Sequence, residues 1–496
     1  MQKGSMDSYF AYREVYRAMG DTVLKIVQTI NSYLTDYVLI FLLVGCGLYF
    51  SVRTRFVQVR CFGEGIKNVF GKLSLKGGKH GGGMSSFQAL ATAIAAQVGT
   101  GNIVGASGAI LLGGPGAIFW MWIIAFLGMA TIYAEAVLAQ KTRIVKENGD
   151  VLGGPVYYIR TAFKGNFGKF LAGFFAVAII IALGFFGCMV QSNSIGEVVN
   201  NAFNVPTWAT GLLLVAISAF IFLGGMDRLA SVTEKIVPIM ATFYLLGGII
   251  IFVANITKAP QAFGLIFKYA FEPQAIIGGA FGAAIKKAVS QGAKRGLFSN
   301  EAGMGSTPHA HAQANVKDPH EQGTVAMIGV FIDTFVVLTI TAITIVLTLY
   351  TDGGPLCNGY QEGMTYNGLA VQKTSLAQMA FGTLFGQTGG NIFIAIALFF
   401  FAYSTVLGWN MFGKINVCYL FGKNERREKA AVKVYTVIAL AFIFLGTIAS
   451  NDLVWELTDF FNYLMVLPNI VGLIACSGLV VSLTHFKDKN TLKIKE

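Results

Sequence analysis

One stretch, Met84 to Leu112, constrains this chain more than any other. It is apolar enough to cross a bilayer, yet glycines and polar side chains interrupt its centre with the sequence QVGTGN at 97–102. Glycine is a poor helix former, and exposed backbone polar groups are most costly at mid-membrane depth. Irregular backbone is tolerated there when it lines a protein-walled cavity, as in the sites of secondary transporters. The stretch therefore predicts a discontinuous helix with a binding site at its break.

Similar apolar runs recur along all 496 residues, so the chain is predicted to be an all-α polytopic membrane protein. Hydrophobic residues make up 54% of it and charged residues only 12%, whereas soluble domains carry about 25% charged residues. The long runs also differ from the ten-residue alternation of a transmembrane β-barrel. We expect no separate soluble domain.

Eleven transmembrane helices are predicted from these runs. They fall at about 31–52, 84–112, 117–140, 169–199, 208–225, 232–254, 275–315, 323–350, 389–413, 432–449 and 455–483. The loop after the first span carries seven Lys or Arg residues against one acid, Glu64. Dense basic loops stay cytoplasmic, which predicts an outside N-terminus and a cytoplasmic C-terminus. The net charge of +12 is thereby explained by topology, so we expect no nucleic-acid partner.

The order of the spans predicts an inverted repeat. The seventh span is interrupted by FSNEAGMG at 298–305. Setting the first span aside, each interrupted span opens a group of five, and broken helices in corresponding positions indicate a transporter site. We divide the chain into an N-terminal segment with an extra helix and basic loop (1–83), a first repeat (84–255), a second repeat (256–483) with an outer loop (351–388), and a cytoplasmic tail (484–496).

The first break offers both kinds of backbone ligand. The N–H groups of Thr100, Gly101 and Asn102 would begin the outer half-helix, and a helix N-terminus suits a small carboxylate. The carbonyls from Ala95 to Val98 would end the inner half-helix and suit a hard cation. Glycines let ligands approach the backbone closely, although they also serve ordinary helix packing. The polar side chains of Gln97 and Asn102, flanking Gly99 and Gly101, favour a site.

A later span could complete a cation site. Ser404, Thr405, Gly408 and Trp409 share one helical face. The two hydroxyls facing the carbonyls of the first break would form an oxygen cage for Na⁺, and the aromatic ring could close over a small substrate. The alternative is that both hydroxyls bond back to their own helix, as is common in membranes.

Three further polar side chains have open roles. Gln191 shares a face with glycines and could bind substrate or bridge helices. Glu301, in the second break, could cap the following half-helix or contact an amino group or cation. Asp333 is a single carboxylate in an apolar run, and intramembrane acids are candidates for coupling or gating by default. The six cysteines show no disulfide or metal spacing, and a metal role for His309 and His311 is disfavoured because acidic or thiol companions are missing.

Several segments together resemble the alanine or glycine:cation symporter family. They are GTGNIVGA at 99–106, GGPGAIFWMW at 113–122, GGPVYYI at 153–159, RGLFSNEAGMGS at 295–306 and STVLGWN at 404–410. The resemblance implies the inverted-repeat fold of the amino-acid/polyamine/cation superfamily, which includes the sodium:neurotransmitter symporter-like fold, with one extra N-terminal span.

The same resemblance implies site roles. A carboxylate would meet the Thr100 and Gly101 amides, and Na⁺ would meet the Ala95 and Val98 carbonyls with the hydroxyls of Ser404 and Thr405. The remaining pocket residues would be Gln191, Ser299, Asn300 and Trp409. Thr100 stands where the neurotransmitter symporters have a leucine, so the chain departs from their pattern at this position.

The predicted function is secondary active import of a small neutral amino acid, alanine or glycine and with glutamine as a further option, coupled to Na⁺ in the cell (inner) membrane. A proton-coupled transporter and an ion channel through the same fold are the alternatives. No enzyme activity is expected, because no nucleophile–base pair has suitable spacing. Na⁺ is the only ion implied, with no other cofactor and no obligatory protein partner.

Overall fold

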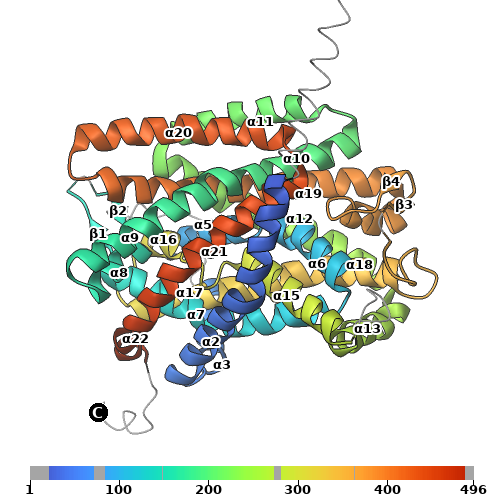
Figure 1. The fold of residues 1–496 in the computed structure, drawn as a ribbon, viewed down its shortest axis with the longest axis horizontal. Coiled ribbons are helices and arrows are strands. Elements are labelled where there is room, and N and C mark those ends of the chain that lie inside the picture. The colour runs from blue at the N-terminus through green and yellow to red at the C-terminus, as the bar shows by residue number, and fades with distance from the viewer. Residues whose placement is uncertain (1–21, 72–83, 148, 273–280, 362, 486–496) are drawn as a thin grey trace, which may run out of the picture.

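The computed structural model describes residues 22–71, 84–147, 149–272, 281–361 and 363–485, which form a bundle of helices (Figure 1). Lys72, Lys76 and Lys79 of the predicted basic loop lie outside the described residues, as do residues 1–21 and the predicted tail after His485.

The N-terminal half begins with one helix and continues through the first interrupted span. The elements are η1 (Leu34–Leu39), α2 (Ile40–Arg53), α3 (Val57–Arg60), α4 (Phe62–Phe70), α5 (Ser86–Gln97), η2 (Gly101–Gly105), α6 (Ala106–Gly113), α7 (Ala117–Thr142), β1 (Ile144–Val145), β2 (Val151–Leu152), α8 (Pro155–Ala162), α9 (Gly165–Ile179), η3 (Ile180–Gly187), α10 (Cys188–Phe203), α11 (Thr207–Phe222) and α12 (Gly225–Ala254). Strands β1 and β2 pair antiparallel, with Ile144 opposite Leu152.

The C-terminal half contains the second interrupted span. Its elements are η4 (Ile256–Lys258), α13 (Ala259–Phe271), α15 (Phe281–Asn300), α16 (Pro308–Ala312), α17 (Pro319–Val330), η5 (Phe331–Leu338), α18 (Thr339–Ile345), η6 (Val346–Tyr350), β3 (Thr365–Tyr366), β4 (Leu369–Ala370), α19 (Leu376–Phe421), α20 (Glu425–Ile448), α21 (Asn451–Ala475) and α22 (Ser477–Leu483). The long helix α19 is kinked at Gly386, whose φ of 73° is left-handed. The segment 351–388 thus holds a small hairpin and the short helical start of α19.

Length and hydropathy identify eight membrane-spanning candidates among the described helices, or nine when the bent pair of 86–97 and 101–113 counts as one span. The eight are Thr22–Arg53, Ala117–Thr142, Gly165–Phe203, Arg228–Ala254, Pro319–Tyr350, Leu376–Phe421, Glu425–Ile448 and Asn451–Ala475. Two of the eleven predicted spans are not among these candidates. Helix α11 has only 16 residues, and α15 carries Lys286, Lys287, Lys294 and Arg295.

The cations on α15 do not all face water. Lys286 and Lys287 are exposed, but Lys294 and Arg295 are buried. The Lys294 Nζ lies 2.8 Å and the Arg295 Nη1 lies 3.2 Å from Oδ2 of Asp459 on α21. A buried cation is costly unless it is paired, so the carboxylate explains why this part of α15 sits inside the bundle instead of in water.

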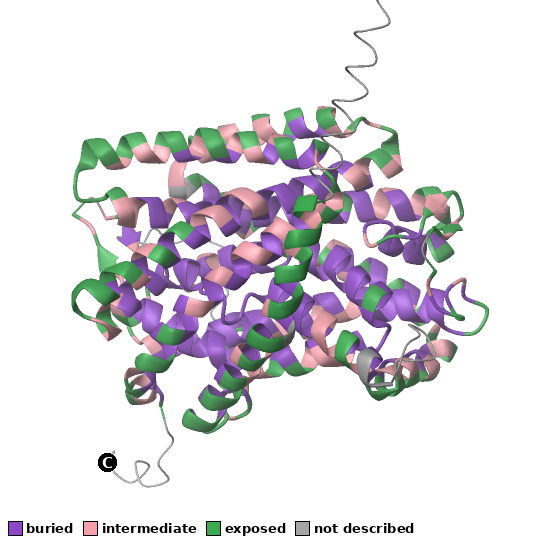
Figure 2. Ribbon diagram, viewed as in Figure 1, coloured by how far each residue is buried: buried purple, intermediate pink, exposed green. Residues whose placement is uncertain are grey.

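The bundle has a buried interior and an outer surface with many exposed apolar side chains. Figure 2 shows buried residues through the middle of the bundle and exposed residues along α2 and α20. Many of the exposed side chains there are apolar, for example Phe41 on α2 and Val437 on α20, as expected for helices facing lipid. Helix α7 contacts α2, α15 and α17, whereas α19 contacts α5, α10 and α12. The interrupted spans thereby lie inside a shell of continuous helices.

Candidate functional site

The first interruption is a real break in the helix. A capping box between Ser85 and Gln88 starts α5, which ends at Gln97, and helical backbone resumes at Gly101 after a 45° bend. Val98 leaves the helical region, with φ −78° and ψ 89°. Every residue from 95 to 103 is buried, so this irregular backbone faces protein, as membrane physics requires.

Polar side chains occupy the open backbone of the first break. The Gly99 amide donates to Oδ1 of Asn102 at 3.0 Å, and the Thr100 amide donates to Oε1 of Gln191 on α10 at 3.1 Å. The space around Gly99 is tight, because a Cβ there would lie 3.1 Å from the same Gln191 oxygen. Gln191 therefore bridges α10 to the break and accepts from an amide that the sequence assigns to the substrate carboxylate.

Four predicted cation ligands converge on the other side of the break. The Thr405 hydroxyl lies 2.9 Å from the Ala95 carbonyl and 3.5 Å from the Val98 carbonyl, and the Ser404 hydroxyl lies 3.3 Å from the Ala95 carbonyl. Both hydroxyls also bond to the Phe401 carbonyl of their own helix. The two hydroxyls thus bond both to their own helix and to the carbonyls of the break. Two hydroxyls and two carbonyls thereby lie together at this point.

The second interruption separates α15, which ends at Asn300, from α16, which begins at Pro308. Glu301, Gly303 and Gly305 all adopt positive φ, at 59°, 93° and 80°. The two glycine amides donate to the two oxygens of the Glu135 carboxylate on α7, at 3.2 and 3.0 Å. Asn469 on α21 donates to the same carboxylate at 2.6 Å. Glu135 thereby satisfies backbone donors that the broken helix would otherwise leave unpaired.

The two breaks meet directly. The Gln97 side chain donates to the Asn300 carbonyl at 2.8 Å, and a Cβ on Gly101 would lie 2.9 Å from the Cα of Ser299. Such a short separation would force the backbones apart, so glycine is required at position 101.

Asp333 on η5 joins the breaks through its carboxylate. Oδ1 accepts from the Asn102 side chain at 2.7 Å, and Oδ2 accepts from the Ser299 hydroxyl at 2.8 Å. The Thr334 hydroxyl also donates to Oδ2, at 2.9 Å. One residue of the first break and one of the second therefore share a single buried carboxylate.

Glu301 and Trp409 form a second link, between the second break and α19. The Trp409 indole donates to Oε1 of Glu301 at 2.6 Å, and the Ser306 hydroxyl donates to Oε2. The Phe298 ring meets the Trp409 ring edge-on at a centroid distance of 5.8 Å. One role left open for Glu301 was to cap the half-helix that follows it. Among the contacts of the described residues, its side chain makes no hydrogen bond to the α16 backbone.

All fifteen residues singled out from the sequence are buried in this region. Glu135 is not among these fifteen residues, although it binds the second break. The signal was present, since Glu135 is an acid within an apolar span. His309 and His311 do not form a pair, because His309 contacts Ser306 and Asn416, whereas His311 contacts Gln322.

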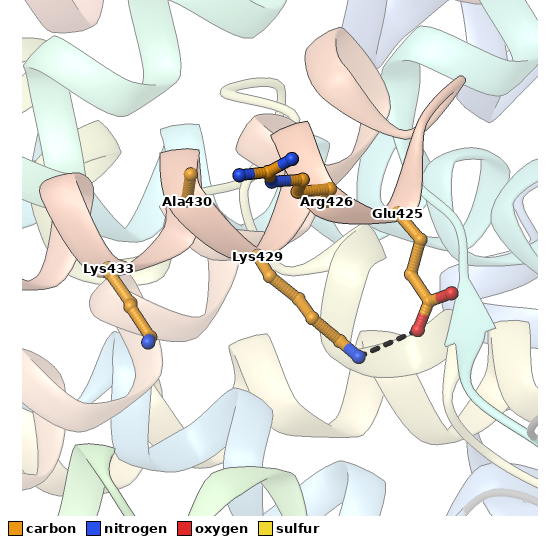
Figure 3. A pocket seen from close by; sticks show the side chains of 5 residues that line it. All are labelled: Glu425, Arg426, Lys429, Ala430 and Lys433. Atoms are coloured by element: carbon orange, nitrogen blue, oxygen red, sulfur yellow. Dashed lines mark ion pairs between the residues drawn. The ribbon is translucent and has the colours of Figure 1, made fainter.

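A surface cavity of about 460 Å³ lies elsewhere, at the start of α20 (Figure 3). It is lined by Glu425, Arg426, Lys429, Ala430 and Lys433, and Glu425 pairs with Lys429 at 2.7 Å. Both partners are highly exposed, so the pair contributes little stability. None of the residues of the two breaks lines this cavity.

Known proteins with similar sequences and folds are transporters. The chain is 41% identical to the sodium/alanine symporter AgcS of Methanococcus maripaludis over 464 residues, covering 93% of this chain and 96% of that one. It is 37% identical to the probable sodium/glutamine symporter GlnT of Bacillus subtilis over 470 residues, covering 95% and 91%.

Solved structures share the fold at low identity. The crystal structure of MhsT in complex with L-phenylalanine superposes with a TM-score of 0.53 at 14% identity, covering 82% of this chain and all of that one. A Na⁺-coupled sialic acid symporter superposes with a TM-score of 0.52 at 12% identity, covering 91% and 85%. The model of the sodium:alanine symporter family matches residues 20–495. The chain is thus a membrane transporter, not an enzyme, and it belongs to the sodium:alanine symporter family.

Proposed function

We propose that this transporter imports a small neutral amino acid together with Na⁺ by alternating access, with both sites at the first break. The observation that carries the proposal is the meeting of two broken helices at a buried cluster of polar groups. Broken helices at mid-depth expose backbone amides and carbonyls that bind an anionic group and a cation at once. The family and the named relatives support amino-acid symport with Na⁺.

Na⁺ would bind to the Ala95 and Val98 carbonyls and the hydroxyls of Ser404 and Thr405. Across the α5–α19 contact the Thr405 hydroxyl lies 2.9 Å from the Ala95 carbonyl and 3.5 Å from the Val98 carbonyl, and the Ser404 hydroxyl lies 3.3 Å from the Ala95 carbonyl. A small rotation of the two hydroxyls would direct their lone pairs at a shared cation, since each hydroxyl has two acceptor lone pairs. Hard cations prefer oxygen ligands over nitrogen or sulfur.

The amino acid would bind with its carboxylate at the Thr100 and Gly101 amides, where the helix dipole favours negative charge. Gln191 would release the Thr100 amide as the carboxylate arrives. Two buried oxygens at this break, Oγ1 of Thr100 and Oε1 of Gln97, have no hydrogen-bond partner within the described residues. Such oxygens are suited to accept from the ammonium group of a zwitterion.

The rest of the pocket limits substrate size. Gly99 and Gly101 bring neighbouring atoms close to the backbone, and Asn102, Ser299 and Asn300 add polar atoms without a net charge. The Trp409 ring would close over the substrate side chain. Close backbone approach and uncharged polar groups favour alanine or glycine, with glutamine as the larger option.

Asp333 and Glu301 would couple the two breaks. Asp333 bonds to one residue of each break, so a movement of one half-helix relative to the other must break or stretch one of these bonds. Glu301 would link the same movement to Trp409 over the substrate.

The gradients available would suffice with one cation. Moving one positive charge inward yields about 2.3 kcal/mol per 100 mV, and a tenfold Na⁺ gradient adds about 1.4 kcal/mol. Together they support a substrate gradient of a few hundredfold by the same arithmetic. The proposal places the chain in the cell (inner) membrane with eleven spans, an outside N-terminus, and inverted repeats over 84–255 and 256–483.

Uptake by purified protein in proteoliposomes tests the proposal, with the Na⁺ gradient and the membrane potential imposed separately. We expect labelled alanine to accumulate only with Na⁺ outside. Unlabelled glycine and glutamine are compared as competitors of that uptake. Accumulation driven by a proton gradient without Na⁺ would favour proton coupling instead. Conductance without amino acid, and no accumulation, would favour a channel.

A further inference from the structure

Three side chains with metal-binding atoms gather away from the breaks, where α4 meets α17. They are Cys61 at the start of α4, Glu64 in its first turn, and His320 in the first turn of α17. The thiol sulfur, a carboxylate oxygen and a ring nitrogen of these residues all lie within 4.8 Å of one another. Cys61 and Glu64 are three residues apart, so one turn of helix presents both to the imidazole.

The imidazole of His320 is held in the orientation of a metal ligand. Its Nδ1 lies 2.5 Å from the Tyr133 hydroxyl on α7, and its other nitrogen, Nε2, faces a Glu64 oxygen at 3.4 Å. His320 is only 1% exposed, and Nε2 makes no hydrogen bond to any described residue. Metal-binding histidines commonly fix their second nitrogen in this way while the first binds the ion.

The geometry points to a binding site for a divalent transition-metal ion of the Zn²⁺ class at this junction, and we propose that Cys61 Sγ, Glu64 and His320 Nε2 are its ligands. Thiolate and imidazole select such ions over Mg²⁺ or Ca²⁺. In a tetrahedral zinc site, bond lengths of about 2.0–2.3 Å place ligand atoms about 3.3–3.8 Å apart. The Glu64 oxygen and His320 Nε2 already have this spacing, at 3.4 Å, and all three ligand atoms lie within 4.8 Å of one another.

The surrounding charges allow a dication. Glu64 and the Cys61 thiolate would balance its charge, and Asp318 lies next to the site, accepting from the His320 amide at 2.9 Å. Two groups oppose a cation. Arg60 donates to the His485 carbonyl at 2.6 Å, and His485 stacks on the His320 ring at 4.4 Å and lies 2.9 Å from Asp318. The Glu64 side chain is 42% exposed, which leaves room for water at a fourth position, as in open zinc sites.

Bound metal would fasten α4 to α17. The two helices already touch, because the Asn68 side chain donates to the Thr324 hydroxyl at 3.0 Å, and a Cβ on Gly65 would lie 2.7 Å from Ile328. A ligand that binds only the folded protein raises its stability with ligand concentration. Zn²⁺ would therefore raise the unfolding temperature through this junction.

Co²⁺ binding to the purified full-length protein in detergent tests the site. We expect one Co²⁺ per chain, a thiolate-to-cobalt charge-transfer absorption, and loss of that absorption when Zn²⁺ is added. Cys61→Ser should remove the charge-transfer absorption, and Glu64→Gln should weaken Co²⁺ binding at least tenfold. The matched control is Cys357→Ser, which alters an exposed cysteine in the loop before β3 and should leave both unchanged.

Thermal unfolding with and without Zn²⁺ gives a second measurement. We expect Zn²⁺ to stabilise the wild type and Cys357→Ser, but not Glu64→Gln. Because Glu64 is partly exposed, that variant should fold even if Cys61→Ser does not. Three results would each overturn the site and leave His320 as a simple partner of Glu64. They are no Co²⁺ binding by the wild type, a charge-transfer absorption that persists in Cys61→Ser, and equal Zn²⁺ stabilisation of Glu64→Gln.

Discussion

Thr405→Ala removes the hydroxyl that lies closest to the carbonyls of the first break. In the structure that hydroxyl is 2.9 Å from the Ala95 carbonyl and 3.1 Å from the Phe401 carbonyl of its own helix. If it serves only the protein, its loss removes an ordinary hydrogen bond, worth about 0.5–1.5 kcal/mol of stability. If it also binds Na⁺, the variant loses an interaction with a charged group as well.

A hydroxyl that binds Na⁺ affects the Na⁺ affinity, whereas one that serves only the protein affects only its stability. A hydrogen-bonding group that contacts a charge contributes about 1.5–3 kcal/mol. Because about 1.4 kcal/mol corresponds to a factor of ten, we expect the Na⁺ concentration for half-maximal uptake to rise by about 10- to 150-fold. The thermal stability of Thr405→Ala without Na⁺ should fall only slightly.

Uptake of labelled alanine into proteoliposomes, measured over a range of Na⁺ concentrations, separates the two cases. Thr405→Ser keeps the hydroxyl and loses only the methyl group, so it should restore most of the Na⁺ affinity. Thr348→Ala is the matched control, because among the described residues that buried hydroxyl bonds only to the Thr344 carbonyl of its own helix, at 2.7 Å. If Thr405→Ala retains the Na⁺ dependence of the wild type, the hydroxyl is not a cation ligand and the reasoning fails.

Three further variants address the buried acids and the indole. Asp333→Asn places an amide opposite the Asn102 amide, which now donates to a carboxylate oxygen at 2.7 Å, so we expect uptake to fall more than tenfold; normal Na⁺-driven uptake would exclude Asp333 from coupling. Glu135→Ala leaves two backbone amides of the second break without their acceptor, at about 1–3 kcal/mol for each buried unsatisfied group, and should lower the unfolding temperature; an unchanged temperature would contradict this role. Trp409→Phe keeps a ring but removes the donor to Glu301 at 2.6 Å, and should raise the KM for the amino acid at least tenfold, whereas an unaltered KM would place the indole outside the pocket.

Local physical chemistry explains how much could be read from the sequence. Apolar runs indicate membrane helices, and glycines within such a run indicate a break, because both effects depend on neighbouring residues. The break at 97–102 follows from this reasoning, and so does the interruption after Asn300. The number of spans is harder to predict from the sequence. The cations of α15 make this helix unsuited to a membrane unless their partner is known. That partner, Asp459, lies 164 residues from Arg295.

Hydropathy and glycine content were enough to predict a membrane protein, a break in its second span, and the polar groups that the break would expose. The distant side chains that meet those groups became known from the packing of the helices. Glu135 binds an amide 168 residues away, and Gln191 binds the amide of Thr100, 91 residues away. The reason is that helix propensity and hydropathy act over a few neighbouring residues, whereas the partner of a buried polar group is selected by the packing of helices that are remote in the chain.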